Sequence, residues 1–297
     1  MRQRRFLAPV LAGCLLLAAS LPASATEVLA SIRPLALIAE AVMQGRGQID
    51  QLVPDGQSSH DYSLRPSDRV HMADAGLVFW VGPSHEAFLV GLLQASPAQQ
   101  VVLEKLPGIT RLPQRDIDSG KAVAGTTDPH LWLSPDNAAR AARALAEALA
   151  AREPENAAFY RHNAAGFADE MQLARDRLKA RLAPVAGQPY VAYHDAYQYL
   201  EQPLGLSFGG SLTAGHEQPP GARHLADLAS DIRNNHSHCL LAEPGFNNSL
   251  AQRAFNGVPA HFVAVDELFT SAPRSPQGYE AGLTQMVDSI HTCLTAP

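Results

Sequence analysis

The chain has 297 residues, of which 46% are hydrophobic and 18% are charged. This much apolar sequence is enough for one large core or two ordinary ones, and it excludes an intrinsically disordered chain. The net charge of −6 leaves no basic surface to neutralise phosphates, so we expect no nucleic-acid partner.

The first 25 residues have the three-part layout of a secretory signal peptide. Arg2 to Arg5 form a basic start, residues 6–21 are almost wholly apolar, and residues 23–25 are the small residues of a cleavage site. The apolar stretch is shorter than the ~20 residues that span a bilayer. We therefore expect export to the periplasm. Residues 11–14 also resemble a lipoprotein processing box, which would place a lipid on Cys14, but the apolar run continues past that cysteine.

Strand-like and helix-like runs alternate along the segment that follows. The runs read as buried strands are 28–32, 49–53, 77–81 and 101–103, and those read as helices are 35–42, 66–75 and 86–94. This alternation predicts an α/β lobe with a mainly parallel sheet. Residues 107–128 break the rhythm, because they are rich in Gly, Pro and charge, and they predict a mobile surface loop. A strong helix is expected over residues 135–151.

Residues 153–182 predict one helix that is too long for an ordinary crossover. A helix of this length would be ~42 Å long, which suits a strut between two lobes. The α/β rhythm then restarts, with strands expected at 190–193, 206–212, 239–242 and 262–265 and helices at 197–202, 221–234, 249–256 and 279–294. We therefore expect an α/β protein of two lobes joined by one long rigid helix: signal peptide 1–25, N-terminal lobe 26–152, linking helix 153–184 and C-terminal lobe 185–297.

Two cysteines remain after removal of the signal peptide. Cys239 and Cys293 form an even pair in an exported chain, which predicts one disulfide. The bond would tie the last helix to the body of the second lobe.

Three histidines stand at or just after expected strand ends, where function concentrates in α/β sheets. His60 lies in a loop after a strand, His130 comes just after the 107–128 loop, and His194 follows residues 190–193 directly. Their wide spacing differs from that of a zinc finger and suits a site assembled from two lobes. Spacing alone makes each of them a weak candidate ligand.

The sequences around these histidines strengthen the hypothesis. Residues 59–68 (SHDYSLRPSD), 128–135 (DPHLWLSP) and 193–200 (YHDAYQYL) resemble the first-, second- and third-ligand motifs of the metal-binding solute-binding proteins of zinc and manganese ABC importers. Residues 240–246 (LLAEPGF) and 265–268 (VDEL) are similar to the C-terminal lobe of the same family. The motifs occur in the family's order and extend over the whole mature chain, and the family implies the same two-lobe fold.

The resemblance implies one zinc site with His60, His130 and His194 as ligands. Manganese-binding relatives have a carboxylate as the third ligand, whereas three imidazoles favour Zn²⁺. Zn²⁺ takes four ligands. Zinc-importing relatives often have Glu before the first histidine, but this chain has Ser59, so Asp266 or a water molecule is the expected fourth ligand. The chain also lacks the histidine-rich loop of many relatives, so we expect no auxiliary site in 107–128.

Each ligating imidazole should donate its second N–H to a nearby acceptor. Asp61, Asp128 and Asp195 are the acceptors expected from sequence proximity. His236 and His238 form a His-x-His pair that can bind metal if exposed, although a solvated loop before Cys239 is the simpler interpretation. The other remaining histidines, including His85, are expected to be ordinary helix or loop residues.

The resemblance further implies delivery of zinc to an ABC permease and its ATPase by a monomeric binding protein, and it leaves open loading by a metallochaperone. A second reading is a secreted adhesin of the same fold. A third, a zinc hydrolase, lacks a motif: His85-Glu86 begins the His-Glu-x-x-His pattern, but Leu89 occupies the second histidine position. We therefore expect no enzyme.

Overall fold

The structure is a computed structural model, and it describes residues 26–213, 221–235, 238–244, 255, 258 and 260–296. The expected signal peptide, which includes Cys14, lies outside the described residues. Of the expected helix over 249–256, only residue 255 is described. Among the helices that are described, none is both long and apolar enough to cross a membrane.

The N-terminal lobe contains a parallel sheet with strand order β2-β1-β3-β4. Its strands are short, and the inner strand β3 (LVFW) is apolar and buried at every position, as is typical of strands covered on both faces. Helix α1 follows β1 with Pro34 in its first turn, where the missing N–H costs no hydrogen bond. The elements are β1 (Glu27–Ala30), α1 (Arg33–Met43), β2 (Gln48–Gln51), α2 (Pro66–Asp74), β3 (Leu77–Trp80), α3 (Val90–Ala95), β4 (Gln99–Val102) and α4 (Pro135–Arg152).

The C-terminal lobe repeats this arrangement, with a parallel sheet of strand order β6-β5-β7-β8. In each lobe the first strand is an inner strand, and the chain switches direction across the sheet beside it, which is where α/β sheets form binding sites. The elements are β5 (Pro189–His194), α6 (Gln198–Leu204), β6 (Ser207–Thr213), α7 (Ala222–Asn235), β7 (Cys239–Ala242), β8 (His261–Ala264) and α9 (Gly278–Leu294).

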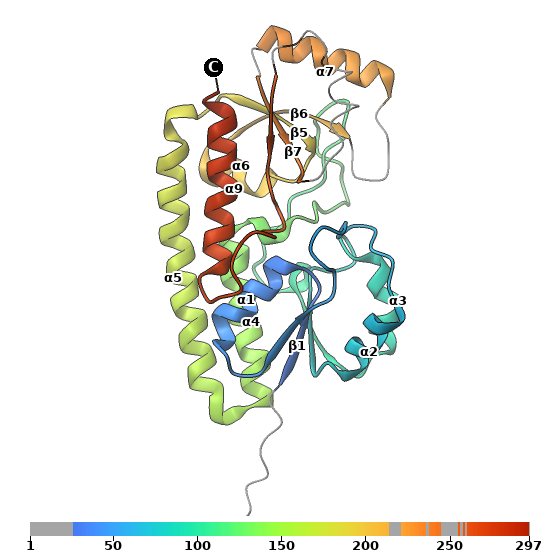
Figure 1. The fold of residues 1–297 in the computed structure, drawn as a ribbon, viewed down its shortest axis with the longest axis vertical. Coiled ribbons are helices and arrows are strands. Elements are labelled where there is room, and N and C mark those ends of the chain that lie inside the picture. Colours follow the sequence, from blue (N-terminus) through green and yellow to red (C-terminus); the bar gives the residue numbers. More distant parts are fainter. Residues whose placement is uncertain are drawn as a thin grey trace, which may run out of the picture.

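Helix α5 (Ala157–Leu182) runs beside both sheets, next to α9 (Figure 1). Its 26 residues make it about 39 Å long. One hydrophobic core includes residues of both lobes and of α5, among them Leu77, Tyr160, Leu241 and Tyr279. The prediction of two α/β lobes with a long linking helix is confirmed. The exact lobe boundaries at residues 152 and 184 stay a prediction.

The segment 107–128 is a loop, as expected, but contacts with the C-terminal lobe hold it in place. Arg115 makes ion pairs with Asp195 (3.4 Å) and with Glu201 of α6. The backbone N–H of Leu112 donates to the Tyr199 hydroxyl at 3.0 Å. The segment is therefore fastened to the C-terminal lobe although its sequence lies between two elements of the N-terminal lobe. Composition indicated the loop but could not reveal these partners.

The disulfide Cys239–Cys293 is present, as predicted, and joins the start of β7 to the last turn of α9 across 54 residues of sequence. Both residues are buried.

Replacing both cysteines by serine should lower the free energy of unfolding. Closing a loop of about 54 residues is worth about 4 kcal/mol in the chain-entropy model, and measured values commonly fall to about 2 kcal/mol. Denaturant unfolding of the double variant measures the loss. Reduced wild-type protein is the matched control and should show a similar loss, whereas an unchanged unfolding midpoint in both samples would contradict the prediction.

Candidate metal centre

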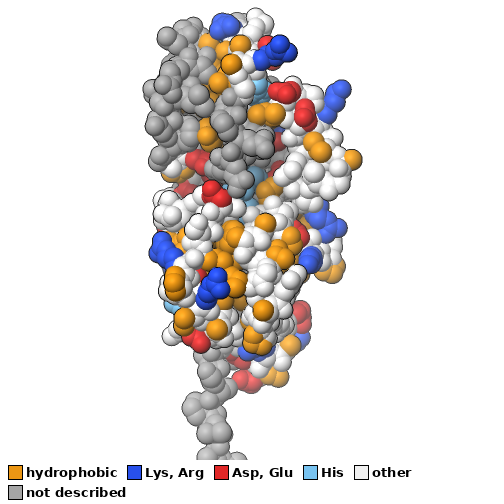
Figure 2. Space-filling model, turned by 90° about the vertical axis from the view of Figure 1, so that its right-hand side faces the viewer, with side chains coloured by type: hydrophobic (Ala, Val, Ile, Leu, Met, Phe, Trp, Pro, Cys, Tyr) orange, Lys and Arg blue, Asp and Glu red, His pale blue; other side chains and the backbone are white. Residues whose placement is uncertain are grey.

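Three histidines from distant parts of the chain converge between the two lobes. One ring nitrogen from each of His60, His130 and His194 lies within 4.8 Å of the other two. The ring centroids are 5.3 Å apart for His60 and His130, 5.7 Å for His60 and His194, and 5.0 Å for His130 and His194. On the face shown in Figure 2, histidine and acidic side chains occur at the level where the lobes meet.

Each histidine is held by a different kind of element. His60 is half-buried in the loop between β2 and α2, and its backbone N–H donates to the Ser58 hydroxyl at 3.3 Å. His130 begins the 3₁₀ turn Leu131–Leu133, which leads into α4, and it is 3% exposed. His194 is the last residue of β5 and is 4% exposed. Two of the three candidate ligands are therefore buried on well-packed elements, and the third lies in a half-buried loop.

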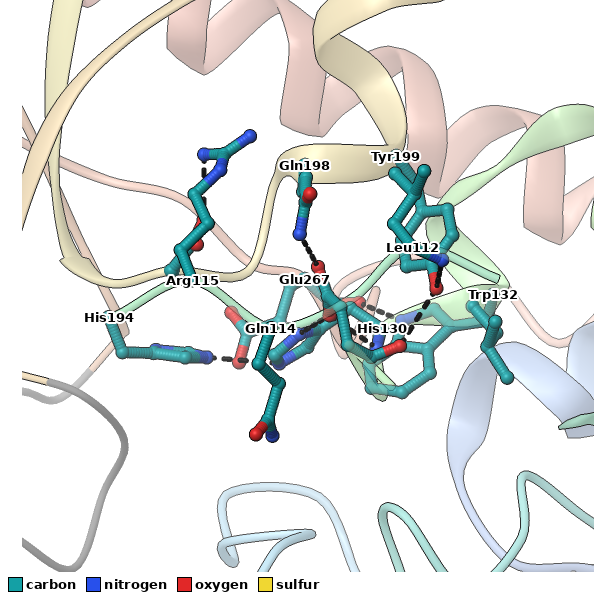
Figure 3. Close-up of polar contacts among 12 residues, drawn as sticks. Leu112, Gln114, Arg115, His130, Trp132, His194, Gln198, Tyr199 and Glu267 are labelled. Carbon is teal, nitrogen blue, oxygen red and sulfur yellow. Dashed lines mark hydrogen bonds and ion pairs between the residues drawn. The ribbon is translucent and has the colours of Figure 1, made fainter. Parts of the chain in front are cut away.

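Asp128 fixes the orientation of His130. The Asp128 Oδ1 atom accepts the His130 backbone N–H at 3.0 Å and lies 2.8 Å from the ring Nδ1. Its Oδ2 atom accepts from Gln198 Nε2 at 2.9 Å, and the Asp128 carbonyl accepts from the Tyr199 hydroxyl. Figure 3 shows Gln198, Tyr199 and Leu112 gathered beside His130. With Nδ1–H directed at Asp128, the lone pair of Nε2 faces the other histidines.

Glu243 has the same relation to His194. Its Oε1 atom lies 2.5 Å from His194 Nδ1, so the Nε2 atom of His194 faces the centre. The two Nε2 atoms of His130 and His194 are 3.1 Å apart. Two nitrogens that share one tetrahedral zinc at ~2.0–2.1 Å are expected about 3.3 Å apart. This spacing fits a single ion between the two rings.

The electrostatics of the centre favour a neutral His194. Burial lowers the pKa of His194, and this effect exceeds the opposing attraction of Glu243. A neutral imidazole is the form that binds a metal.

The acceptors expected from sequence proximity are found in different places. Asp128 contacts a candidate ligand, as expected. Asp195 instead pairs with Arg115, and Asp61 has an exposed side chain. Glu243 was missed. Glu243 directly follows the apolar run that forms β7, but only the pairing of β7 with β5, which ends in His194, brings the two side chains together.

Asp266 is not part of the histidine group. Its carboxylate accepts hydrogen bonds from the backbone N–H of Leu268 (3.1 Å) and Thr270 (2.6 Å) and from the Thr270 hydroxyl (2.7 Å). The N–H of Ser271 adds a fourth bond at 3.3 Å. Both oxygens thus close the turn after β8. That Asp266 is a ligand stays a prediction, which would require the carboxylate to give up part of this turn.

His85 is a fourth histidine at the centre, although its sequence context suggested an ordinary loop residue. The ring is 3% exposed and packs edge-on against His60, with 4.4 Å between centroids, and against Trp132, with 4.7 Å. Trp132 is fully buried, and its indole N–H donates to the Glu267 carbonyl at 2.8 Å.

Comparisons with known proteins agree with this architecture. Residues 28–293 match the family model described as zinc-uptake complex component A, periplasmic. The high-affinity zinc uptake system protein ZnuA of Yersinia pestis is 33% identical, with 96% of each chain covered. A crystal structure of ZnuA has a TM-score of 0.79 at 22% identity, covering 91% of this chain and all of the other. The laminin-binding protein Lmb of Streptococcus agalactiae, described as a bifunctional protein with adhesin and metal transporting activity, has a TM-score of 0.78 at 20% identity, with 91% and 100% covered.

Proposed function

The chain belongs to the family of periplasmic zinc-uptake components, and on that premise we propose that it binds one Zn²⁺ between its lobes through His60, His130 and His194. The observation that carries the proposal is the convergence of three imidazoles within 4.8 Å, two of them oriented by carboxylates. Three imidazoles suit a borderline metal such as Zn²⁺.

Zinc is the cargo of this protein, which passes it to an ABC permease driven by an ATPase subunit. We infer that the chain is exported by its signal peptide, acts in the periplasm without a lipid on Cys14, and works as a monomer. Binding of zinc at this site does not require a metallochaperone to load the ion. The similarity to Lmb at 20% identity shows a shared fold only, so it does not support an adhesin function for this chain.

A cavity beside the histidines suits the approach of a cation. It has a volume of about 170 Å³ and is lined from one lobe by residues 56–59 and from the other by Glu243, Asp266 and Glu267, among others. Burial raises the pKa of Glu267 well above its usual range. A negative lining raises the local concentration of cations.

Titration of the metal-free mature protein with Zn²⁺ in the presence of a competing chelator tests the proposed function. The expected result is one zinc per chain. In a second experiment, the gene should restore growth under zinc limitation to a strain that lacks its own periplasmic zinc-binding component. A protein that does not compete with the chelator would contradict the proposal.

Replacing Glu243 by glutamine should weaken zinc binding by about 10- to 100-fold. The amide accepts the Nδ1–H of His194 more weakly than the carboxylate does, and it lacks the negative charge that makes the imidazole ring more basic. Chelator competition measures the loss. Asp61→Asn is the matched control: this carboxylate also lies next to a candidate ligand in sequence, but it is exposed and should change the affinity little. Equal effects of the two variants would show that Glu243 has no special role.

Replacing Asp266 by alanine should weaken zinc binding less than loss of a histidine, because the carboxylate is already engaged by four donors in its own turn. The same variant should lower the melting temperature of the metal-free protein, since these donors lose their acceptor. A loss of affinity equal to that of a histidine variant, with the melting temperature unchanged, would instead identify Asp266 as the fourth ligand.

A further inference from the structure

His85 stands on a rigid turn directed at the candidate metal centre. The turn follows β3, and the backbone N–H groups of His85 and Glu86 both donate to the Gly82 carbonyl, at 3.0 and 2.9 Å. The Glu86 side chain is buried and accepts the Gly82 N–H at 3.0 Å and the Ser31 hydroxyl. These bonds fix the backbone of the turn, so the fold sets the position from which the His85 side chain extends.

The position of the His85 ring is close to that of a fourth metal-binding imidazole. Two imidazoles that bind one tetrahedral zinc at ~2.0–2.1 Å have ring centres about 5 Å apart. The centroid of His85 lies 4.4 Å from that of His60 and 6.2 Å from that of His130. The first distance is shorter than that separation by about 0.6 Å and the second is longer by about 1.2 Å. The nitrogens of His85 are outside the 4.8 Å group, so binding requires the His85 ring to rotate about its side-chain bonds toward His130 and His194.

The chemistry of the centre calls for such a ligand. Zn²⁺ takes four ligands, and three imidazoles leave one position to fill. Ser59 precedes His60, and a serine hydroxyl is a poor zinc ligand. Asp266 already accepts four hydrogen bonds within its own turn. A neutral imidazole in a buried position brings no additional charge that would have to be removed from water.

We propose that His85 is the fourth zinc ligand of this chain, so that the bound ion is surrounded by four imidazole nitrogens. This rests on the proposed function, because it completes the same site. A site made only of nitrogen ligands discriminates more strongly against Mn²⁺, which prefers oxygen, than a site with a carboxylate does.

X-ray absorption at the zinc edge, on protein loaded with one equivalent of Zn²⁺, counts the imidazoles on the metal. The expected count is four for the wild type and three for His85→Phe. The phenylalanine ring keeps the packing against Trp132 and removes both nitrogens. Chelator competition should show affinity for zinc lowered by about 10- to 100-fold in this variant. His71→Phe is the matched control, because His71 is an exposed histidine of α2 in the same lobe, and it should match the wild type.

The outcomes separate this proposal from the function on which it rests. Tight binding of one zinc with three imidazoles in the wild type, or unchanged affinity and count in His85→Phe, overturns the role of His85 and leaves the proposed function standing. Failure of the wild type to hold zinc against the chelator overturns the function itself. If His85→Phe is not folded by circular dichroism, His85→Asn, which is smaller and a poor ligand, is measured and judged by the same criteria.

Discussion

Replacing His130 by alanine should lower the zinc affinity of the protein by about 100- to 1,000-fold. Protein zinc sites with four ligands bind with about 10–16 kcal/mol, so that one ligand contributes about 2.5–4 kcal/mol on average. His130 is well prepared for this role, because Asp128 holds both its backbone and its ring. Chelator competition with purified wild type and variant gives the ratio, and His194→Ala should behave similarly.

His162→Ala is the control for this experiment, because His162 is an exposed histidine on α5, and it should retain the wild-type affinity. The melting temperature of the metal-free variant shows whether His130→Ala is folded, since Asp128 keeps its bonds from Gln198 and Tyr199. A folded His130→Ala protein with wild-type affinity would remove His130 from the site.

Zinc affinity should fall by about 100- to 1,000-fold between pH 7 and pH 5. Protons and zinc compete for the same ring nitrogens, so binding releases protons and weakens as the pH falls. An ordinary imidazole has a pKa near 6.5, and three of them would lose about 10⁴-fold over this range. Burial lowers the pKa of His194, so its ring stays neutral to a lower pH and its share of the loss is smaller.

The measurement is a series of competition titrations at fixed ionic strength, with a chelator whose own protonation is corrected for. His194→Ala should show a shallower dependence on pH, because it has one fewer competing ring. Constant affinity from pH 7 to pH 5 would be incompatible with a site built from imidazoles.

The architecture could be predicted from the sequence, because short apolar runs alternate with helical ones and one uninterrupted helical stretch separates two such groups. The three histidines were also predictable, since each follows an expected strand or loop within a motif of recognised order. These are local signals. They depend on residues that are close together in sequence, as do the turn chemistry and the apolar pattern that define each element.

The partners of the histidines depended on tertiary structure and were predicted less well. Asp195 was expected to support His194, but successive residues of an extended chain point to opposite sides, and Asp195 contacts Arg115 instead. The residue beside His194 is Glu243, because β7 lies next to β5 in the sheet. Strand order is a property of the whole lobe, and no spacing along the chain encodes it.

His85 shows the same limit for packing. Its burial results from three segments that meet at one point: the turn after β3, the loop that carries His60, and the turn that contains Trp132. In the sequence it is one of 12 histidines, and it lies outside the three motifs that contain His60, His130 and His194.

Diffraction at the zinc absorption edge, from crystals of the protein loaded with one equivalent of Zn²⁺, tests the central claim most directly. The account predicts a single strong anomalous peak between the lobes, at ~2.0–2.1 Å from a ring nitrogen of each of His60, His130 and His194. A principal peak at any other place, or a peak that only one of these histidines touches, would contradict it.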